Sequence, residues 1–269
     1  MARNPDWFLF NKIFESYDKI KFQKEPCERL VIHAGIGEGE RVLDVACGTG
    51  WATLAAARAV KQTGHAIGIN IADKALEIAR GKALTASLKN ISFEEQDGHH
   101  PKFKDAVFDV VTCASALFGF QDIPGALREW RRVVRPGGRV AISSFGPEFR
   151  RVSTMLRNTI AKYHTGPSPR NPNEGYLETI EQCANQLADA GFSNIQTAPE
   201  ELGYYYPNLD TYWEEDVISS MRRIPLDKLD PVTAERVRLE HLEEMKTFTR
   251  DEGIWRSVPT LFALGLRSN

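Results

Sequence analysis

The sequence lacks the features that would place the chain in a membrane or on a nucleic acid. Its 269 residues contain no apolar run near the roughly 20 residues that a bilayer-spanning helix needs. Lysine and arginine total 34 and aspartate and glutamate total 36, so the charge of −2 favours neither nucleic acid nor anionic lipid. The first residues lack the apolar stretch of a signal peptide. We therefore expect a cytoplasmic protein without membrane or nucleic-acid partners.

Cysteine pairs and metal-ligand clusters are also missing. The cysteines are far apart, form no CxxC pair and share no zinc-like spacing with histidine. We expect free thiols in a reducing compartment and no metal site. The hydrophobic share of 42% and the charged share of 26% are those of an ordinary globular protein, which excludes a disordered chain.

Strand-like and helix-like segments alternate from residue 41 onward. The strand-like segments are 41–46, 65–70, 91–96, 108–114 and 139–144. Such alternation predicts an α/β fold with a doubly wound, mostly parallel sheet covered by helices on both faces. Two later strand-like segments, 195–198 and 259–266, bring the expected sheet to seven strands. Ligands of such sheets bind at the carboxyl ends of the strands.

The other segments predict additions to this core. We expect an N-terminal helical cap at 1–40, an α/β core at 41–200, a helical lid insertion at 201–256 and a final core strand at 257–269. Asp73 is a plausible N-cap of a helix that reaches about residue 88.

A glycine turn carries the strongest chemical signal. The strand Val42-Leu43-Asp44-Val45-Ala46 leads into Cys47-Gly48-Thr49-Gly50, and a helix follows. Glycine permits positive φ and a close approach of ligand to backbone. A dinucleotide fingerprint fails because Thr53 replaces its third glycine and Asn70, not an acid, ends the second strand. The P-loop pattern fails as well, so a nicotinamide or nucleotide-phosphate site is disfavoured.

The segment Asp44-Val45-Ala46-Cys47-Gly48-Thr49-Gly50 resembles motif I of the class I S-adenosylmethionine (SAM) dependent methyltransferases. Three further blocks follow in the family's order, namely Phe108-Asp109-Val110-Val111 with Asp122, residues 127–140, and Ala190-Gly191-Phe192. The subgroup it is most similar to contains the small-molecule ubiquinone and menaquinone C-methyltransferases. The resemblance implies a Rossmann-like methyltransferase fold, SAM as cofactor, and methyl transfer to a small, partly apolar or aromatic acceptor.

The same resemblance implies a role for each matching position. The methionine end of SAM would lie on Ala46, Gly48, Thr49 and Gly50, and Asp44 would orient this turn or reach the SAM amino group. The remaining cofactor positions are Asn70 and Ile71 after the second strand, Asp97, Gly98 and His99 at the adenine, Cys113 and Ala114 beside the sulfonium, and Tyr17 closing over the cofactor.

Asn70 departs from the family pattern, which has Asp or Glu there. An amide offers one acceptor oxygen and cannot form the charge-assisted bonds that a carboxylate makes with the ribose hydroxyls. The departure indicates weaker SAM binding, a changed cofactor or chemistry, or a strand that ends elsewhere.

Two histidines are candidate general bases, because histidine titrates near neutral pH. They are His100, after the third strand, and His164, before a proline-rich loop. The alternative for the His99-His100 pair is that both are neutral loop residues. Phe118, Phe120 and Phe145 follow strand ends and are expected to line an apolar acceptor pocket.

Methyl transfer from SAM needs no nucleophilic residue and no metal, because alignment of donor and acceptor supplies much of the rate. Other chemistry on the same fold, such as that of a lyase, a dehalogenase or a cyclase, is the alternative. A binding protein with a vestigial site is a third reading. The acceptor and the oligomeric state are not encoded in any motif.

Overall fold

The computed structural model describes residue 14 and residues 16–163, 177–220 and 222–268. His164, most of the first expected helix and the proline-rich loop lie outside the described residues. The strands are β1 (Arg41–Val45), β2 (His65–Asn70), β3 (Ile91–Glu95), β4 (Phe108–Cys113), β5 (Val134–Phe145), β6 (Ser193–Tyr206), β7 (Thr249–Arg250) and β8 (Gly253–Leu266).

The helices with their bounds are α2 (Lys24–His33), α3 (Trp51–Val60), α4 (Asp73–Thr85), α5 (Ile123–Val133), α6 (Pro147–Ala161), α7 (Ile180–Asp189), α8 (Leu209–Tyr212), α9 (Arg223–Leu226) and α10 (Pro231–Met245). Four short 3-10 or π-helical segments are η1 (Lys21–Gln23), η2 (Leu117–Gly119), η3 (Trp213–Ile218) and η4 (Lys246–Phe248). Within the described part of the chain, no helix is both long enough and apolar enough to span a bilayer.

The strands form one sheet in the order β3-β2-β1-β4-β5-β8-β6, and the short β7 pairs with β8 outside this path. The first five strands are parallel, whereas β8 runs antiparallel between β5 and β6. The sheet is therefore doubly wound and mostly parallel, with seven strands along its path, and the expectation from the sequence is confirmed.

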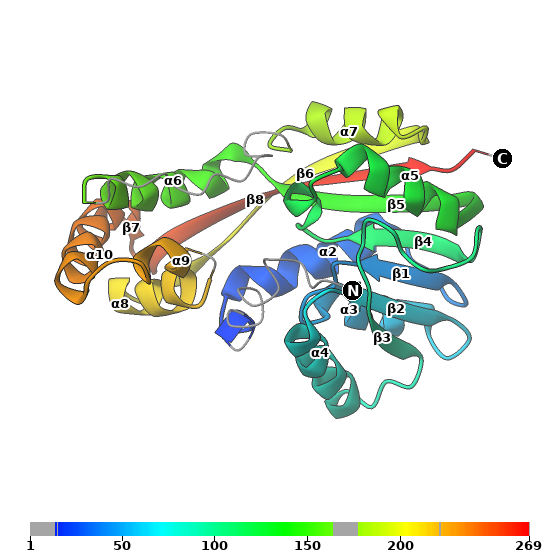
Figure 1. Cartoon of the computed structure of the whole chain (residues 1–269), viewed down its shortest axis with the longest axis horizontal. Helices are drawn as coiled ribbons and strands as arrows, with labels where there is room; N and C mark the ends of the chain where they lie inside the picture. The colour runs from blue at the N-terminus through cyan, green and yellow to red at the C-terminus, as the bar shows by residue number, and fades with distance from the viewer. Residues whose placement is uncertain (1–13, 15, 164–176, 221, 269) are drawn as a thin grey trace.

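Helices cover both faces of this sheet because its central strands are apolar on both sides (Figure 1). On one face, Trp130 and Leu127 of α5 and Leu187 of α7 pack over the strands. On the other face, α2 and α3 pack through Leu30, Val31 and Val60, and α4 packs beside α3. The carboxyl ends of β1, β2 and β4 are left uncovered by these helices, and the predicted cofactor residues lie there.

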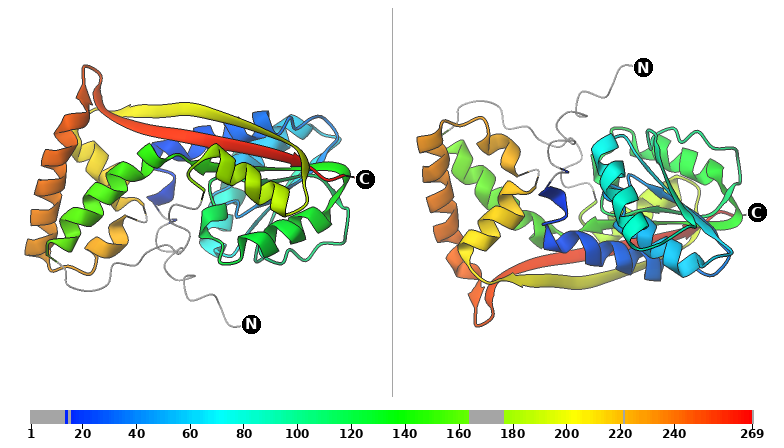
Figure 2. Two further views of the ribbon diagram at one scale, coloured as in Figure 1. Left: turned by 90° about the horizontal axis from the view of Figure 1, so that it is seen from above. Right: turned by 90° about the horizontal axis from the view of Figure 1, so that it is seen from below.

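Two strands are much longer than the sequence pattern indicated. The expected segments 195–198 and 259–266 are the inner parts of β6 and β8, whose pairing continues to Tyr206 and Ile254. The outer parts leave the core as a two-stranded ribbon that carries a helical lobe, defined here as α6, α8, η3, α9 and α10 (Figure 2). Helix α6 belongs to this lobe although its residues fall in the range expected for the core.

The start of α4 differs from the expectation. The N-cap is Ala72, not Asp73, and the side chain of Asn70 accepts the Ala72 N–H at 2.9 Å. The asparagine folds back on the chain two residues later, as Asn often does in turns, and this sets the helix start. The helix also ends at Thr85, earlier than predicted.

Candidate functional site at the carboxyl ends of the strands

The glycine turn between β1 and α3 has the geometry of an anion-binding loop. Ala46, Gly48 and Gly50 have φ of 55°, 53° and 88°, whereas the residues between them have negative φ. Alternation of positive and negative φ can turn neighbouring N–H groups toward one side, as in anion-binding concavities. The N–H groups of Cys47 and Gly50 donate to the Ile69 and Cys47 carbonyls, so those of Gly48 and Thr49 are the ones an anion would meet. The positive end of the α3 dipole begins at the same turn. The turn thus fits a carboxylate such as that of the methionine end of SAM.

Asp44, near the end of β1, forms hydrogen bonds that hold the strand end and α3 beside this turn. Its carboxylate is fully buried and accepts hydrogen bonds from the hydroxyls of Thr53 at 2.6 Å and Thr112 at 2.9 Å. Burial raises the pKa of Asp44 to about 6, and the two hydroxyl donors limit the rise. Because both oxygens are bonded within the protein, this geometry favours the orienting role over direct contact with the SAM amino group.

Glycine is required where neighbouring elements crowd the site. A Cβ at Gly50 would lie 2.9 Å from the Ala79 Cβ, and one at Gly98 would lie 2.5 Å from a methyl group of Val45. A larger residue at either position would push α4 or the loop after β3 away from the turn.

Asn70 ends β2 and is nearly buried. The expected strand end is therefore correct, and the side chain lies at the edge where the family places its acidic residue. The bond from the Ala72 N–H occupies one of the two lone pairs of Oδ1. One weak acceptor site and the amide donor remain for ribose hydroxyls. Ile71 follows in the same short connection.

The loop after β3 is held in place by α5. The indole N–H of Trp130 donates to the Gly98 carbonyl at 2.8 Å. Asp97 accepts the His99 N–H at 2.9 Å, and the His99 ring lies over Phe120 at 4.7 Å between centroids. Burial opposes the ionisation of Asp97, but the bonds from His99 outweigh it and lower the pKa of the carboxyl. An ionised Asp97 in a fixed loop fits a contact with the amino group of an adenine.

The end of β4 lies between β1 and β5. Cys113 is fully buried and burial raises the pKa of its thiol, so the thiol is inert. Ala114 follows, and Ser115 has φ of 50° and donates its N–H to the Ser143 hydroxyl of β5 at 3.0 Å. This bond ties the ends of β4 and β5 together. Ser143 has no signal in the sequence, because its partner is 28 residues away.

The N-terminal segment lies across the glycine turn. The Asp18 carboxylate accepts hydrogen bonds from the Thr49 hydroxyl at 2.6 Å and the Trp51 indole at 3.1 Å, and it pairs with Lys82 of α4 at 2.8 Å. Tyr17 packs against two buried apolar clusters. One holds Phe14 and the start of α4, and the other is formed by Ile20, Phe22, Phe145 and Val258. The tyrosine therefore lies between the predicted cofactor site and the end of β5, and its role in closing over the cofactor stays a prediction. Sequence reasoning missed Asp18.

Four phenylalanines form a second feature of this edge, called here the aromatic cluster: Phe22, Phe118, Phe145 and Phe149. Phe145 stacks on Phe149 at 4.0 Å, and Phe22 meets both rings edge to face. Phe118 lies 6.4 Å from Phe145. The expected acceptor-lining residues Phe118 and Phe145 are thus brought together, whereas Phe120 packs instead against Trp130 and His99.

Of the two candidate bases, only His100 lies within the described residues. His100 is exposed, and its backbone N–H donates to the Asp97 carbonyl. His164 lies outside the described residues. A role for either as a base therefore stays a prediction. Among the described residues no His, Cys, Asp and Glu side chains gather as a metal site, and all four cysteines are free.

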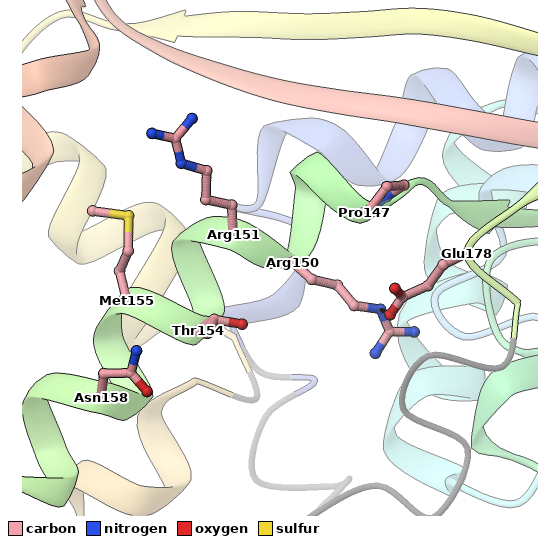
Figure 3. Close-up of a pocket in the computed structure, with 7 residues that line it drawn as sticks. All are labelled: Pro147, Arg150, Arg151, Thr154, Met155, Asn158 and Glu178. Atoms are coloured by element: carbon pink, nitrogen blue, oxygen red, sulfur yellow. Dashed lines mark ion pairs between the residues drawn. The ribbon is translucent and has the colours of Figure 1, made fainter.

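A surface pocket of about 410 Å³ lies beside the aromatic cluster (Figure 3). Its lining residues are Pro147, Arg150, Arg151, Thr154, Met155, Asn158 and Glu178. Arg150 pairs with Glu178 at 2.5 Å and its guanidinium lies 5.5 Å from the Phe118 ring. The pocket is separate from the glycine turn, because none of its lining residues comes from β1, β2 or β4.

Comparison with known proteins identifies the family of this chain. Residues 36–187 match a family model described as a methyltransferase domain. The chain belongs to the class I SAM-dependent methyltransferase family. The resemblance stated from the motifs is confirmed, and the cofactor of this family is SAM.

Among curated relatives, the demethylmenaquinone methyltransferase of Staphylococcus aureus (strain JH9) is 36% identical over 138 residues. The match covers 49% of this chain and 56% of the relative, so the chain spans little more than half the length of that relative. The similarity to this relative therefore concerns about half of each chain.

Solved structures share the fold. The YcgJ protein of Bacillus subtilis superposes with a TM-score of 0.62 at 19% identity, over 91% of this chain and 98% of that chain. A SAM-dependent methyltransferase of Aquifex aeolicus superposes with a TM-score of 0.52 at 20% identity, over 72% of this chain and 91% of that chain. At such identities the likeness shows the fold alone.

Proposed function

We propose that this chain transfers a methyl group from SAM to a small, partly apolar or aromatic acceptor by in-line displacement. The observation that carries the proposal is the position of Tyr17, between the anion-binding glycine turn and the aromatic cluster. The donor then lies on one side of this side chain and an apolar acceptor on the other. The name of the Staphylococcus relative, a demethylmenaquinone methyltransferase, supports a small-molecule acceptor.

The protein's own contribution is alignment and exclusion of water. When bound, SAM would supply a methyl group on a cationic sulfur. The acceptor's electron pair forms a bond to the methyl carbon, and the pair of the broken carbon–sulfur bond goes to the sulfur. The glycine turn fixes the amino-acid end of the cofactor, and Asp97 fixes the adenine. Tyr17 and the rings of the aromatic cluster hold the acceptor and keep solvent away. Alignment of this kind contributes on the order of 7–11 kcal/mol to the lowering of a barrier.

A neutral acceptor must also lose a proton to a base. His100 and His164 stay our candidates for its removal. An acceptor that is ionised at neutral pH needs neither of them, because its nucleophilic oxygen or carbon already carries the electron pair.

Product analysis tests the proposal. The purified chain is incubated with SAM carrying a labelled methyl group and with small aromatic and apolar acceptors, and both S-adenosylhomocysteine and labelled product are measured. We expect equal amounts of the two. A separate calorimetric titration with S-adenosylhomocysteine is expected to show binding. Failure to bind this product, in a protein shown to be folded, would contradict the proposal.

A second candidate is a reaction that uses bound SAM without consuming it, such as that of a lyase, a dehalogenase or a cyclase. Asn70 favours it, because its amide departs from the acidic residue of the family. The [4+2]-cyclase SpnF also shares this fold, with a TM-score of 0.57 at 20% identity over 90% of this chain and 81% of that chain. Substrate turnover with no loss of SAM would favour the second candidate over the first.

A further inference from the structure

Two buried arginines in the helical lobe share a single carboxylate. Asp216 of η3 is fully buried, and its two oxygens accept from Arg222 and from Arg256, each at 3.2 Å. Arg256 is also nearly fully buried, and the Arg222 side chain is 10% exposed. Among the described residues, this cluster therefore holds two positive charges against one negative charge. A net charge in an apolar setting is costly unless a partner balances it.

The two arginines differ in how fully their donors are used. Arg256 donates from all three of its side-chain nitrogens, to Asp216 and to the carbonyls of Ser257 and Phe149. Arg222 donates from Nε to the Ser153 hydroxyl and from Nη1 to Asp216. Within the described part of the chain, its Nη2 has no hydrogen-bond acceptor. Arg222 is thus the member with spare donor capacity.

Arg222 faces the aromatic cluster. Its guanidinium lies 5.4 Å from the Phe149 ring and 6.0 Å from the Phe22 ring. Phe22 in turn contacts Phe145 at the end of β5, and Tyr17 packs in the same group. Burial raises the pKa of the Tyr17 phenol, and the charge of Arg222 opposes this rise only weakly. The spare donor is therefore at the place where the acceptor is expected.

The positive charge of another arginine in this region is neutralised by a carboxylate. Arg150, on the other side of the aromatic cluster, has Glu178 as its own partner. The surplus positive charge is thus specific to the Arg222 side. A guanidinium with free N–H groups beside aromatic rings suits a planar carboxylate on an apolar skeleton, because Arg binds both oxygens of such a group.

We propose that Arg222 binds a carboxylate of the methyl acceptor, so that the acceptor is an aromatic or similarly planar organic acid. This inference rests on the proposed function, since it concerns the same site. The acceptor's ring packs on the aromatic cluster and its acid group meets Arg222. The lobe thus selects acids, whereas the core binds the cofactor.

Paired ligands test the acid preference. Benzoate, cinnamate and 2-naphthoate are titrated calorimetrically into the full chain saturated with S-adenosylhomocysteine, and each is compared with its primary carboxamide. We expect at least one acid to bind at least tenfold more tightly than its amide. In Arg222→Gln the ratio is expected to fall to about two or less, and in Arg222→Lys part of it is expected to remain.

Arg223→Gln is the matched control, because Arg223 is adjacent in sequence and pairs with Asp227 on the lobe surface. Its acid preference is expected to equal that of the unaltered chain. Thermal unfolding and S-adenosylhomocysteine affinity report whether each variant folds. The comparison of acids with amides in the unaltered chain does not depend on whether a variant folds. Equal affinity of this chain for acids and amides, or no binding of any acid, overturns the proposal. Retained binding of S-adenosylhomocysteine in that case leaves the methyltransferase function standing.

Discussion

At the scale of single residues, Asn70 is the clearest point of departure from the family. We expect Asn70→Asp to tighten SAM binding about fivefold, because a carboxylate accepts both the Ala72 N–H and a ribose hydroxyl, and bonds to a charged group are stronger by about 1 kcal/mol. Calorimetry with SAM measures the change.

Asn208→Asp is the control for added charge, since Asn208 caps α8 in the lobe and its side chain accepts the Thr211 N–H. This variant is expected to bind SAM as the unaltered chain does. An unchanged or weaker affinity in Asn70→Asp would show that the ribose does not lie at this side chain.

Asp44 gives a second residue-scale prediction, which concerns pH. Its pKa rises from 3.8 in the unfolded chain to about 6 in the folded one, so between these values the folded state binds more protons. The contribution of Asp44 to the free energy of unfolding is therefore present at low pH. It is lost as pH rises between these two pKa values, by about 3 kcal/mol in all. We expect Asp44→Asn to remove this slope when unfolding free energies are measured from pH 4 to pH 7.

The matched control is Asp109→Asn, because Asp109 lies at the amino-terminal end of β4 and interacts with Arg41 and Arg135 on the surface. This variant is expected to retain the slope. Parallel curves for Asp44→Asn and the unaltered chain would contradict the assignment.

The candidate cofactor residues could be named from the sequence because their motifs are local, and their roles stay predictions. Asp44, Gly48 and Gly50 occur within one strand and turn, and Asn70 and Asp97 each follow a strand whose end the pattern marks. Asp18, Ser143 and Arg222 were not predicted, since each acts through partners far away in the chain. A single aspartate, serine or arginine carries no sign of such a partner in its own neighbourhood.

At the scale of elements, the position of the N-terminal segment on the core depends on the carboxylate of Asp18. We expect Asp18→Ala to release this segment from Thr49, Trp51 and Lys82, which leaves the cofactor less enclosed. SAM affinity is expected to fall several-fold, and limited proteolysis near residues 16–20 is expected to speed up.

Lys19→Ala tests whether any change in the segment has this effect, because Lys19 is exposed. It is expected to leave both measurements unchanged. Equal protease resistance of Asp18→Ala and the unaltered chain would mean that packing of Tyr17 alone holds the segment.

Most strands and helices of the core were predicted to within a residue or two, whereas the ribbon was not. Two further exceptions are β5, which begins at Val134 and not at residue 139 because the chain stays extended through the Pro-Gly-Gly segment, and α4, which ends at Thr85. The inner strands have apolar residues in continuous runs, so composition marks them. The outer part of β6 contains Glu200, Glu201 and three tyrosines, and that of β8 contains Arg256 and Ser257. Their extended form comes from pairing with each other, and such long-range pairing overrides local preference.

At the scale of the whole molecule, a buried histidine of the lobe is expected to respond to acid in the direction opposite to Asp44 of the core. His241 in the lobe is fully buried, and its Nε2 lies 2.8 Å from the Tyr212 hydroxyl. Burial, and then the charge of Arg222, lower its pKa from 6.5 to about 4. The unfolded state therefore binds more protons between these values, and stability from this group is lost as pH falls, by about 3 kcal/mol in all.

We therefore expect the lobe to lose protection from hydrogen exchange when pH is lowered from 7 to 5, after correction for intrinsic rates, while α3 and α5 of the core stay protected. His241→Gln is expected to remove the effect. His65→Gln, on β2 of the core, is expected to retain it. Equal loss in both halves would indicate a single cooperative unit.

The ribbon has a consequence for the origin of specificity. Tyr206 and Ile254 are paired neighbours, so everything from residue 207 to residue 253 leaves and returns at one point of the sheet. A piece of chain attached in this way can be exchanged for another, or reduced to a tight turn, without rethreading the strands. Transplanting it between related proteins offers a route to catalysts with new selectivity on an unchanged donor site.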